Sequence, residues 1–133
     1  MKKILLAYDG GEPAKRALEQ TIELATRFEA EVGVISVVPV RSGRTAIDPW
    51  DDRTVHAEEL LEARKALREA GIEAEMLEPG GHVARTIERV ADERGYDTIV
   101  VGTRGVRSLA RTLHGSVSEH VASHAHVTVV VAR

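Results

Sequence analysis

The residues best suited to bind an anion lie between Gly102 and Ser118. Gly102 and Gly105 are followed, after nine residues, by Gly115 and Ser116. Glycine lets the backbone approach a ligand closely, so that successive N–H groups can point at an anion. Gly115 and Ser116 precede an apolar helical stripe, and a helix N-terminus offers free N–H groups and a positive dipole. The spacing therefore predicts a phosphate-binding loop.

The same segment is basic within a chain that is acidic overall. It contains Arg104, Arg107 and Arg111 and has no acidic residue. The whole chain has 18 basic and 21 acidic residues, which gives a formal charge of −3. That balance argues against a surface that coats duplex DNA, and an aromatic content of 3% argues against one that stacks single-stranded nucleic acid. We expect an anionic small molecule as the ligand and no nucleic-acid partner.

Several other chemistries find little support in the sequence. It has no Walker A pattern and no cysteine, which excludes thiol chemistry, Cys-ligated zinc and disulfides. No serine has an indicated His–Asp pair, so we assign no catalytic residue. His120 and His124 are four residues apart on a predicted helix, near His126, and such spacing can place two imidazoles on one metal. No third ligand is indicated, and we assign no metal site.

Alternating apolar runs and helical stripes supply the elements that position the anion-binding segment. A length of 133 residues suits a single domain over 1–133. Strict alternation of strands and helices favours a doubly wound α/β fold, with a five-stranded parallel sheet in the flavodoxin-like order 3-2-1-4-5 and helices on both faces. The strands are expected at 3–8, 31–38, 72–77, 97–101 and 127–131, and the helices at 12–28, 57–70, 83–95 and 117–125.

This strand order places the first and fourth strands side by side at the topological switch point. Ligands of such sheets bind in the crevice at the carboxyl ends of these strands. Here those ends carry Asp9 with two glycines after it, and the segment that begins at Gly102. No apolar run approaches the ~20 residues of a membrane span, so we expect no membrane association. Together with the lack of cysteine, this favours the cytoplasm.

The pattern G-x2-G-x9-G-S between Gly102 and Ser116 resembles the nucleotide-binding signature of the universal stress protein family. The similarity extends from Lys2 through Asp9 and Gly10 to the last strand. The resemblance implies a homodimeric α/β fold that binds ATP, with any Mg²⁺ or Mn²⁺ held through the triphosphate. The chain departs from the family where Gly11 replaces a frequent serine.

The resemblance also implies a role for each matching residue. Asp9 would face the ribose or the adenine, and Ala7 and Val37 would line the adenine pocket. The residues implied to pack on the ribose and phosphates, or to hold the phosphates, are Val101, Gly102, Gly105, Gly115, Ser116, Val117 and Ser118. We add Arg104 for its charge.

Two functions remain open at this stage. The first is an ATP-binding stress-response or regulatory protein with slow or no hydrolysis, because no residue is an obvious water-orienting group. The second is a dimeric adaptor of the same fold without functional nucleotide binding. The segment 39–52, which lacks periodicity and contains the only tryptophan, is either a binding loop or an excursion from the fold.

The last strand suggests how two copies pair. From Val127 to Val131 it has no charge, no proline and no glycine, and such a bare edge tends to pair with another strand. The strand expected at the opposite edge is protected by Glu73, Glu75 and Glu78. We therefore expect a homodimer that pairs through the last strand about a two-fold axis.

Overall fold

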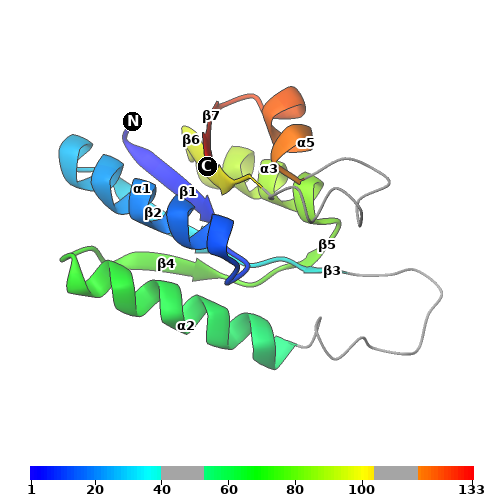
Figure 1. The fold of residues 1–133 in the computed structure, drawn as a ribbon. Helices are drawn as coiled ribbons and strands as arrows, with labels where there is room; N and C mark the ends of the chain where they lie inside the picture. The colour runs from blue at the N-terminus through cyan, green and yellow to red at the C-terminus, as the bar shows by residue number, and fades with distance from the viewer. Residues whose placement is uncertain (40–52, 104–116) are drawn as a thin grey trace.

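The main sheet has the predicted topology. The computed structural model describes residues 1–39, 53–103 and 117–133. Within them a five-stranded parallel sheet has the order β4-β2-β1-β6-β7 (Figure 1). The order 3-2-1-4-5 is thereby confirmed. The strands are β1 (Lys3–Ala7), β2 (Glu31–Ile35), β4 (Ala74–Leu77), β6 (Thr98–Gly102) and β7 (Thr128–Ala132).

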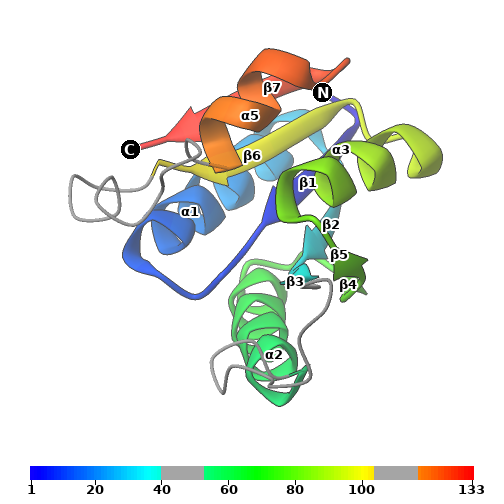
Figure 2. The same ribbon diagram turned by 90° about the vertical axis from the view of Figure 1, so that its right-hand side faces the viewer.

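Helices cover both faces of the sheet, as predicted. On one face α1 (Glu12–Phe28) and α2 (Arg53–Glu69) pack on Ile4 and Leu6 of β1. On the other face α3 (Val83–Arg94) and α5 (Val117–His124) pack on Leu5 (Figure 2). Alternate side chains of a strand point to opposite faces, so β1 contributes to both cores. Within the described residues, no helix combines the length and the apolar character needed to cross a bilayer.

The strand predicted at 31–38 is divided in two. β2 ends at Ile35, and β3 (Val38–Pro39) pairs instead with β5 (Gly80–Gly81) in a separate two-stranded sheet. The division occurs where the hydrogen-bond partner changes. The Val38 N–H donates at 2.8 Å to the carbonyl of Pro79, which lies beyond the end of β4. A continuous apolar run does not reveal this change of partner.

Other boundaries differ from the predicted ones by a few residues. α2 begins at Arg53 rather than at 57, and β4 begins at Ala74 rather than at 72. Ile72 instead follows the turn that closes α2, where its N–H donates to the carbonyl of Leu67 at 2.9 Å. β6 and β7 each lie one residue further along the chain than expected.

Asp97 fixes the start of β6 to the start of β1. Its Oδ2 accepts the Lys2 N–H at 2.7 Å and the Lys3 N–H at 3.3 Å, while its Oδ1 accepts the Thr98 hydroxyl at 2.8 Å. Burial acts to raise the pKa of Asp97, but these donors prevail and lower it below its ordinary value. The charged carboxylate therefore holds the two central strands in register.

Gly33 in β2 leaves the space that the Tyr96 ring fills. A Cβ at this position would lie 2.0 Å from Tyr96 Oη. Tyr96 is 2% exposed, and its hydroxyl donates to Glu75 Oε1 at 3.4 Å. Burial, followed by the nearby charge of Glu75, raises the pKa of Tyr96 to about 12. The missing side chain of Gly33 thus allows a large aromatic residue into the core.

We expect Gly33→Ala to lower the free energy of unfolding by about 1–3 kcal/mol, the usual cost of overpacking a core. The reason is that the new methyl group must displace the Tyr96 ring. Urea denaturation followed by circular dichroism measures the change. In a Tyr96→Leu background the same substitution should cost less, and an equal cost in both backgrounds would contradict this account.

Candidate functional site

The carboxyl ends of β1 and β6 lie side by side, as the predicted switch point requires. Parallel pairing aligns Leu6 with Val100. Beyond it, Gly102 lies against the first turn of α1, where a Cβ would be 2.3 Å from the carbonyl oxygen of Pro13. Only a glycine fits such an approach without a shift of the backbone. The turn after β1 and the end of β6 therefore form one continuous surface.

An apolar wall lies next to this surface. Ala7, Val37 and Val101 belong to the core on the α3 and α5 side of the sheet, with Val37 6% and Val101 2% exposed. Val117, the first residue of α5, packs against the same core. Four of the residues singled out in the sequence thus gather on one side of the switch point, although they come from different elements.

Polar groups occupy the neighbouring turn and helix. Asp9 is exposed, and its Oδ1 accepts the Gly11 N–H at 2.9 Å, which fixes the turn that leads into α1. Ser118 is 7% exposed within α5. Four of the predicted site residues lie outside the described residues: Gly105, Gly115 and Ser116, which the resemblance implies, and Arg104, which was added for its charge.

A polar cluster below the Asp9 turn was not anticipated from the sequence. Ser36, just after β2, lies with its Oγ 2.7 Å from His56 Nδ1 and donates to Glu59 Oε2 at 3.3 Å. A Cβ at Gly10 would be 3.2 Å from Glu59 Cγ, so this carboxyl lies directly under the turn. His56, Glu59 and Glu62 are spaced three residues apart on α2 and so lie near one another on the helix. The helix predicted over 57–70 leaves His56 out, and this spacing therefore does not stand out in the sequence.

The network does not form a catalytic triad. Ser36 and Glu59 both contact Nδ1 of His56, the latter at 3.5 Å, whereas a relay needs one partner on each ring nitrogen. Both hydrogen-bonding neighbours thus lie on the Nδ1 side of the ring, which leaves the opposite nitrogen, Nε2, outside the network. Nε2 is buried without a hydrogen-bond partner among the described residues. The cluster therefore leaves one buried ring nitrogen for a hydrogen bond with a ligand.

Burial makes this part of the site costly to ionise. Burial, then the charges of Asp9 and Glu62, raises the pKa of Glu59 from 4.5 to about 7, against the lowering effect of the Ser36 hydrogen bond. Tyr8 donates to Glu62 Oε1 at 2.6 Å, and burial followed by this bond raises the pKa of the Tyr8 hydroxyl. The end of β1 is thus acidic, whereas the segment after β6 is basic in sequence.

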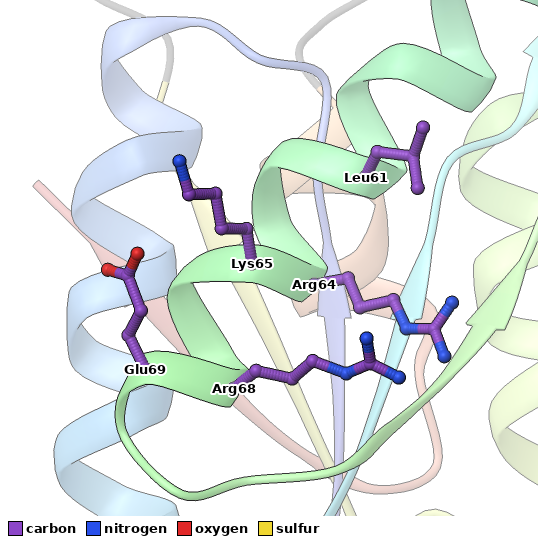
Figure 3. A pocket seen from close by; sticks show the side chains of 5 residues that line it. All are labelled: Leu61, Arg64, Lys65, Arg68 and Glu69. Atoms are coloured by element: carbon purple, nitrogen blue, oxygen red, sulfur yellow. The ribbon is translucent and has the colours of Figure 1, made fainter.

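A separate hollow of about 380 Å³ lies on the exposed side of α2. In Figure 3 the side chains of Arg64 and Arg68 extend toward the same side of the helix, while Lys65 and Glu69 extend toward the other. Arg68 already pairs with Glu73, with Nε 3.3 Å from Oε1. The hollow is lined by one helix and contains none of the predicted site residues, so we assign it no function.

The raised pKa of Glu59 predicts a pH-dependent stability. The pKa of Glu59 is higher in the folded protein than in the unfolded chain, so protonation of Glu59 stabilises the fold. This stabilisation is fully present below pH ~4.5 and is lost as the pH rises through about 7. We expect Glu59→Gln to be more stable than the wild type at pH 8, by up to about 3 kcal/mol, and to lose this advantage at pH 4.5. Urea denaturation at both pH values provides the measurement. The exposed Glu23→Gln serves as control, and a gain independent of pH would refute the assignment.

The comparisons place the chain among known proteins. Residues 1–133 match the model of the universal stress protein family. The chain is 36% identical over 141 residues to universal stress protein MJ0531 of Methanocaldococcus jannaschii, with 99% of this chain and 82% of the relative covered.

Solved structures show the same fold. The universal stress protein of Archaeoglobus fulgidus in complex with dAMP has a TM-score of 0.73 and 26% identity, covering 100% of this chain and 98% of that one. A family protein of Arabidopsis thaliana with AMP bound has a TM-score of 0.68 and 21% identity, covering 99% and 91% of the two chains. Since the family match spans the whole length and is supported by a relative at 36% identity, this chain belongs to the universal stress protein family.

Proposed function

We propose that this protein binds ATP at the carboxyl ends of β1 and β6. The observation that carries the proposal is the placement of Gly102 against the first turn of α1, which follows the Asp9 turn, next to the apolar wall of Ala7, Val37 and Val101. An apolar wall with a few converging polar groups is the usual construction of a small-molecule site. The dAMP and AMP complexes of the two solved relatives support an adenine nucleotide as the ligand.

Each part of the nucleotide meets suitable chemistry in this arrangement. The adenine packs on Ala7 and Val37, and the Asp9 carboxylate accepts hydrogen bonds from the ribose. The phosphates, and with them any Mg²⁺ or Mn²⁺, are held by the segment before α5 and by its first turn, because the positive end of a helix dipole favours an anion. The implied phosphate contacts are Gly102, Arg104, Gly105, Gly115, Ser116, Val117 and Ser118, with Val101 beneath the ribose.

The protein acts as a nucleotide-dependent stress-response regulator rather than as an efficient ATPase. Rapid phosphoryl transfer requires a group that orients the attacking water. The polar cluster below the Asp9 turn lies near the end of β1, on the α2 side of the sheet, and Glu59 is itself turned toward Ser36 and His56. We therefore expect slow hydrolysis or none.

Two copies pair through β7. This strand forms one edge of the main sheet, and Val131 leaves 39% of its surface exposed there. Val129 and Val130 pack partly against the two cores of their own subunit, so this edge presents its backbone and the exposed apolar side chain of Val131. Antiparallel pairing about a two-fold axis covers both.

We expect Gly115→Val to abolish ATP binding, because any side chain there fills space that the phosphates need. Asp9→Ala should weaken binding about tenfold to a hundredfold, the value of one hydrogen bond to a charged group. Isothermal titration calorimetry with ATP measures both. The exposed Glu23→Ala on α1 is the control and should bind as the wild type does. An unchanged affinity in a folded Gly115→Val protein would refute the site, and a dimer without ATP affinity would favour an adaptor.

We expect Val131→Lys to shift the protein from dimer to monomer at micromolar concentration, because pairing would bury two lysines at the edge of β7. Analytical ultracentrifugation measures the distribution. Leu61→Lys is the matched control, since Leu61 is also exposed, at 61%, but lies on α2. A wild type that is monomeric under these conditions would rule out the proposed interface.

A further inference from the structure

A second group of ligating side chains lies between α3 and α5. Glu88 of α3 and His120 and His124 of α5 each offer one ligand atom, and these atoms lie within 4.8 Å of one another. The two helices pack against each other on the same face of the sheet (Figure 2). The sequence indicated no third ligand for His120 and His124. The fold supplies one in Glu88, which lies 32 positions before His120 in the chain.

Hydrogen bonds already prepare the two imidazoles for a metal. Nδ1 of His124 lies 2.9 Å from the carbonyl oxygen of His120, so Nδ1 carries the hydrogen and Nε2 keeps its electron pair. This bond from a ligand histidine to a carbonyl is a common feature of metal sites. The His120 and His124 rings are stacked, with centroids 4.2 Å apart and planes at 21°. The two rings therefore lie face to face, and one nitrogen of each is within 4.8 Å of the other.

We propose that Glu88, His120 and His124 form a binding site for a divalent transition metal of the Zn²⁺ class. Two imidazoles and one carboxylate suit Zn²⁺, Co²⁺ or Ni²⁺ better than Mg²⁺ or Ca²⁺, which prefer oxygen ligands throughout. Ligand atoms bound to tetrahedral zinc at about 2.0–2.1 Å are about 3.3 Å from one another. The three ligand atoms here lie within 4.8 Å of one another, so small side-chain rotations bring them to that spacing. A water molecule or an external ligand fills the fourth position.

The surroundings of the cluster fit a metal that enters from solvent. The side chain of His120 is 31% exposed and that of Glu88 17%, while His124 is exposed. Nδ1 of His120 is 3.0 Å from Glu88 Oε1, so the negative charge is already next to the imidazoles. The ring of His82 lies 5.8 Å from that of His120, but its Nδ1 accepts the Arg85 N–H at the start of α3. His82 is therefore engaged as a helix cap.

The experiment titrates Co²⁺ into metal-free, untagged, nucleotide-free protein and follows the visible absorption of the bound ion. Zn²⁺ is then added as competitor. We expect one equivalent of Co²⁺ to bind and Zn²⁺ to displace it. Loss of a residue that only hydrogen-bonds to a metal ligand weakens metal binding roughly 10–100-fold. We expect a larger loss when a ligand itself is removed, in Glu88→Gln, His120→Ala and His124→Ala. Zn²⁺ should also raise the melting temperature of the wild type and not that of the variants, because the site exists only in the folded state.

Two histidine variants serve as matched controls. His126→Ala removes an exposed imidazole whose Nδ1 lies 3.3 Å from Asp92, outside the cluster. His82→Asn removes the third nearby ring while keeping a good capping residue. Both should bind Co²⁺ as the wild type does. The proposal is overturned if the wild-type protein binds neither Co²⁺ nor Zn²⁺, or if the three ligand variants bind as tightly as the wild type. It is also overturned if the two control variants lose as much affinity as the three ligand variants.

Discussion

The pairing of β1 with β6 is the constraint on which the rest of the structure depends. β1 is buried on both faces, with Ile4, Leu5 and Leu6 each 0% exposed, and burying such side chains contributes about 1.5–3 kcal/mol apiece. The pairing is fixed at one end by Asp97, which accepts N–H groups from the start of β1. At the other end it brings the Asp9 turn to Gly102. The position of the candidate site is therefore a consequence of how the central strands pack.

The ends of these strands also carry the groups that the fold accommodates least easily. The half-buried carboxyl of Glu59 is held near the charge of Asp9, and the buried Nε2 of His56 has no protein partner among the described residues. Neither arrangement stabilises the folded chain, and strongly perturbed groups of this kind are concentrated at functional sites. Their location beside the switch point, rather than elsewhere in the core, agrees with a ligand that completes their hydrogen bonds.

The sequence predicted the strand order and the helices because apolar periodicity reports which face of each element is buried. It did not predict β3, because Val37 and Val38 continue the apolar run of β2 although their backbone partners differ. The Ser36–His56–Glu59 network was missed for a related reason, since it joins residues that only the packing of α2 on β2 brings together. Of the candidate site, the sequence identified Gly102 at the end of β6 and Asp9 in the turn after β1, but not the groups behind them.

The helix α5 connects the two sites that we propose. Its first turn, at Val117 and Ser118, would contact phosphates, and its later turns carry His120 and His124, which face Glu88 of α3. A metal at these histidines would join α5 to α3 and restrain the helix that follows the phosphate-binding segment. Linkage requires that any effect of the metal on nucleotide affinity be matched by an equal effect of the nucleotide on metal affinity. A helix of only eight residues is well placed for such coupling, because the proposed phosphate contacts and the metal-binding histidines lie within about two turns of each other.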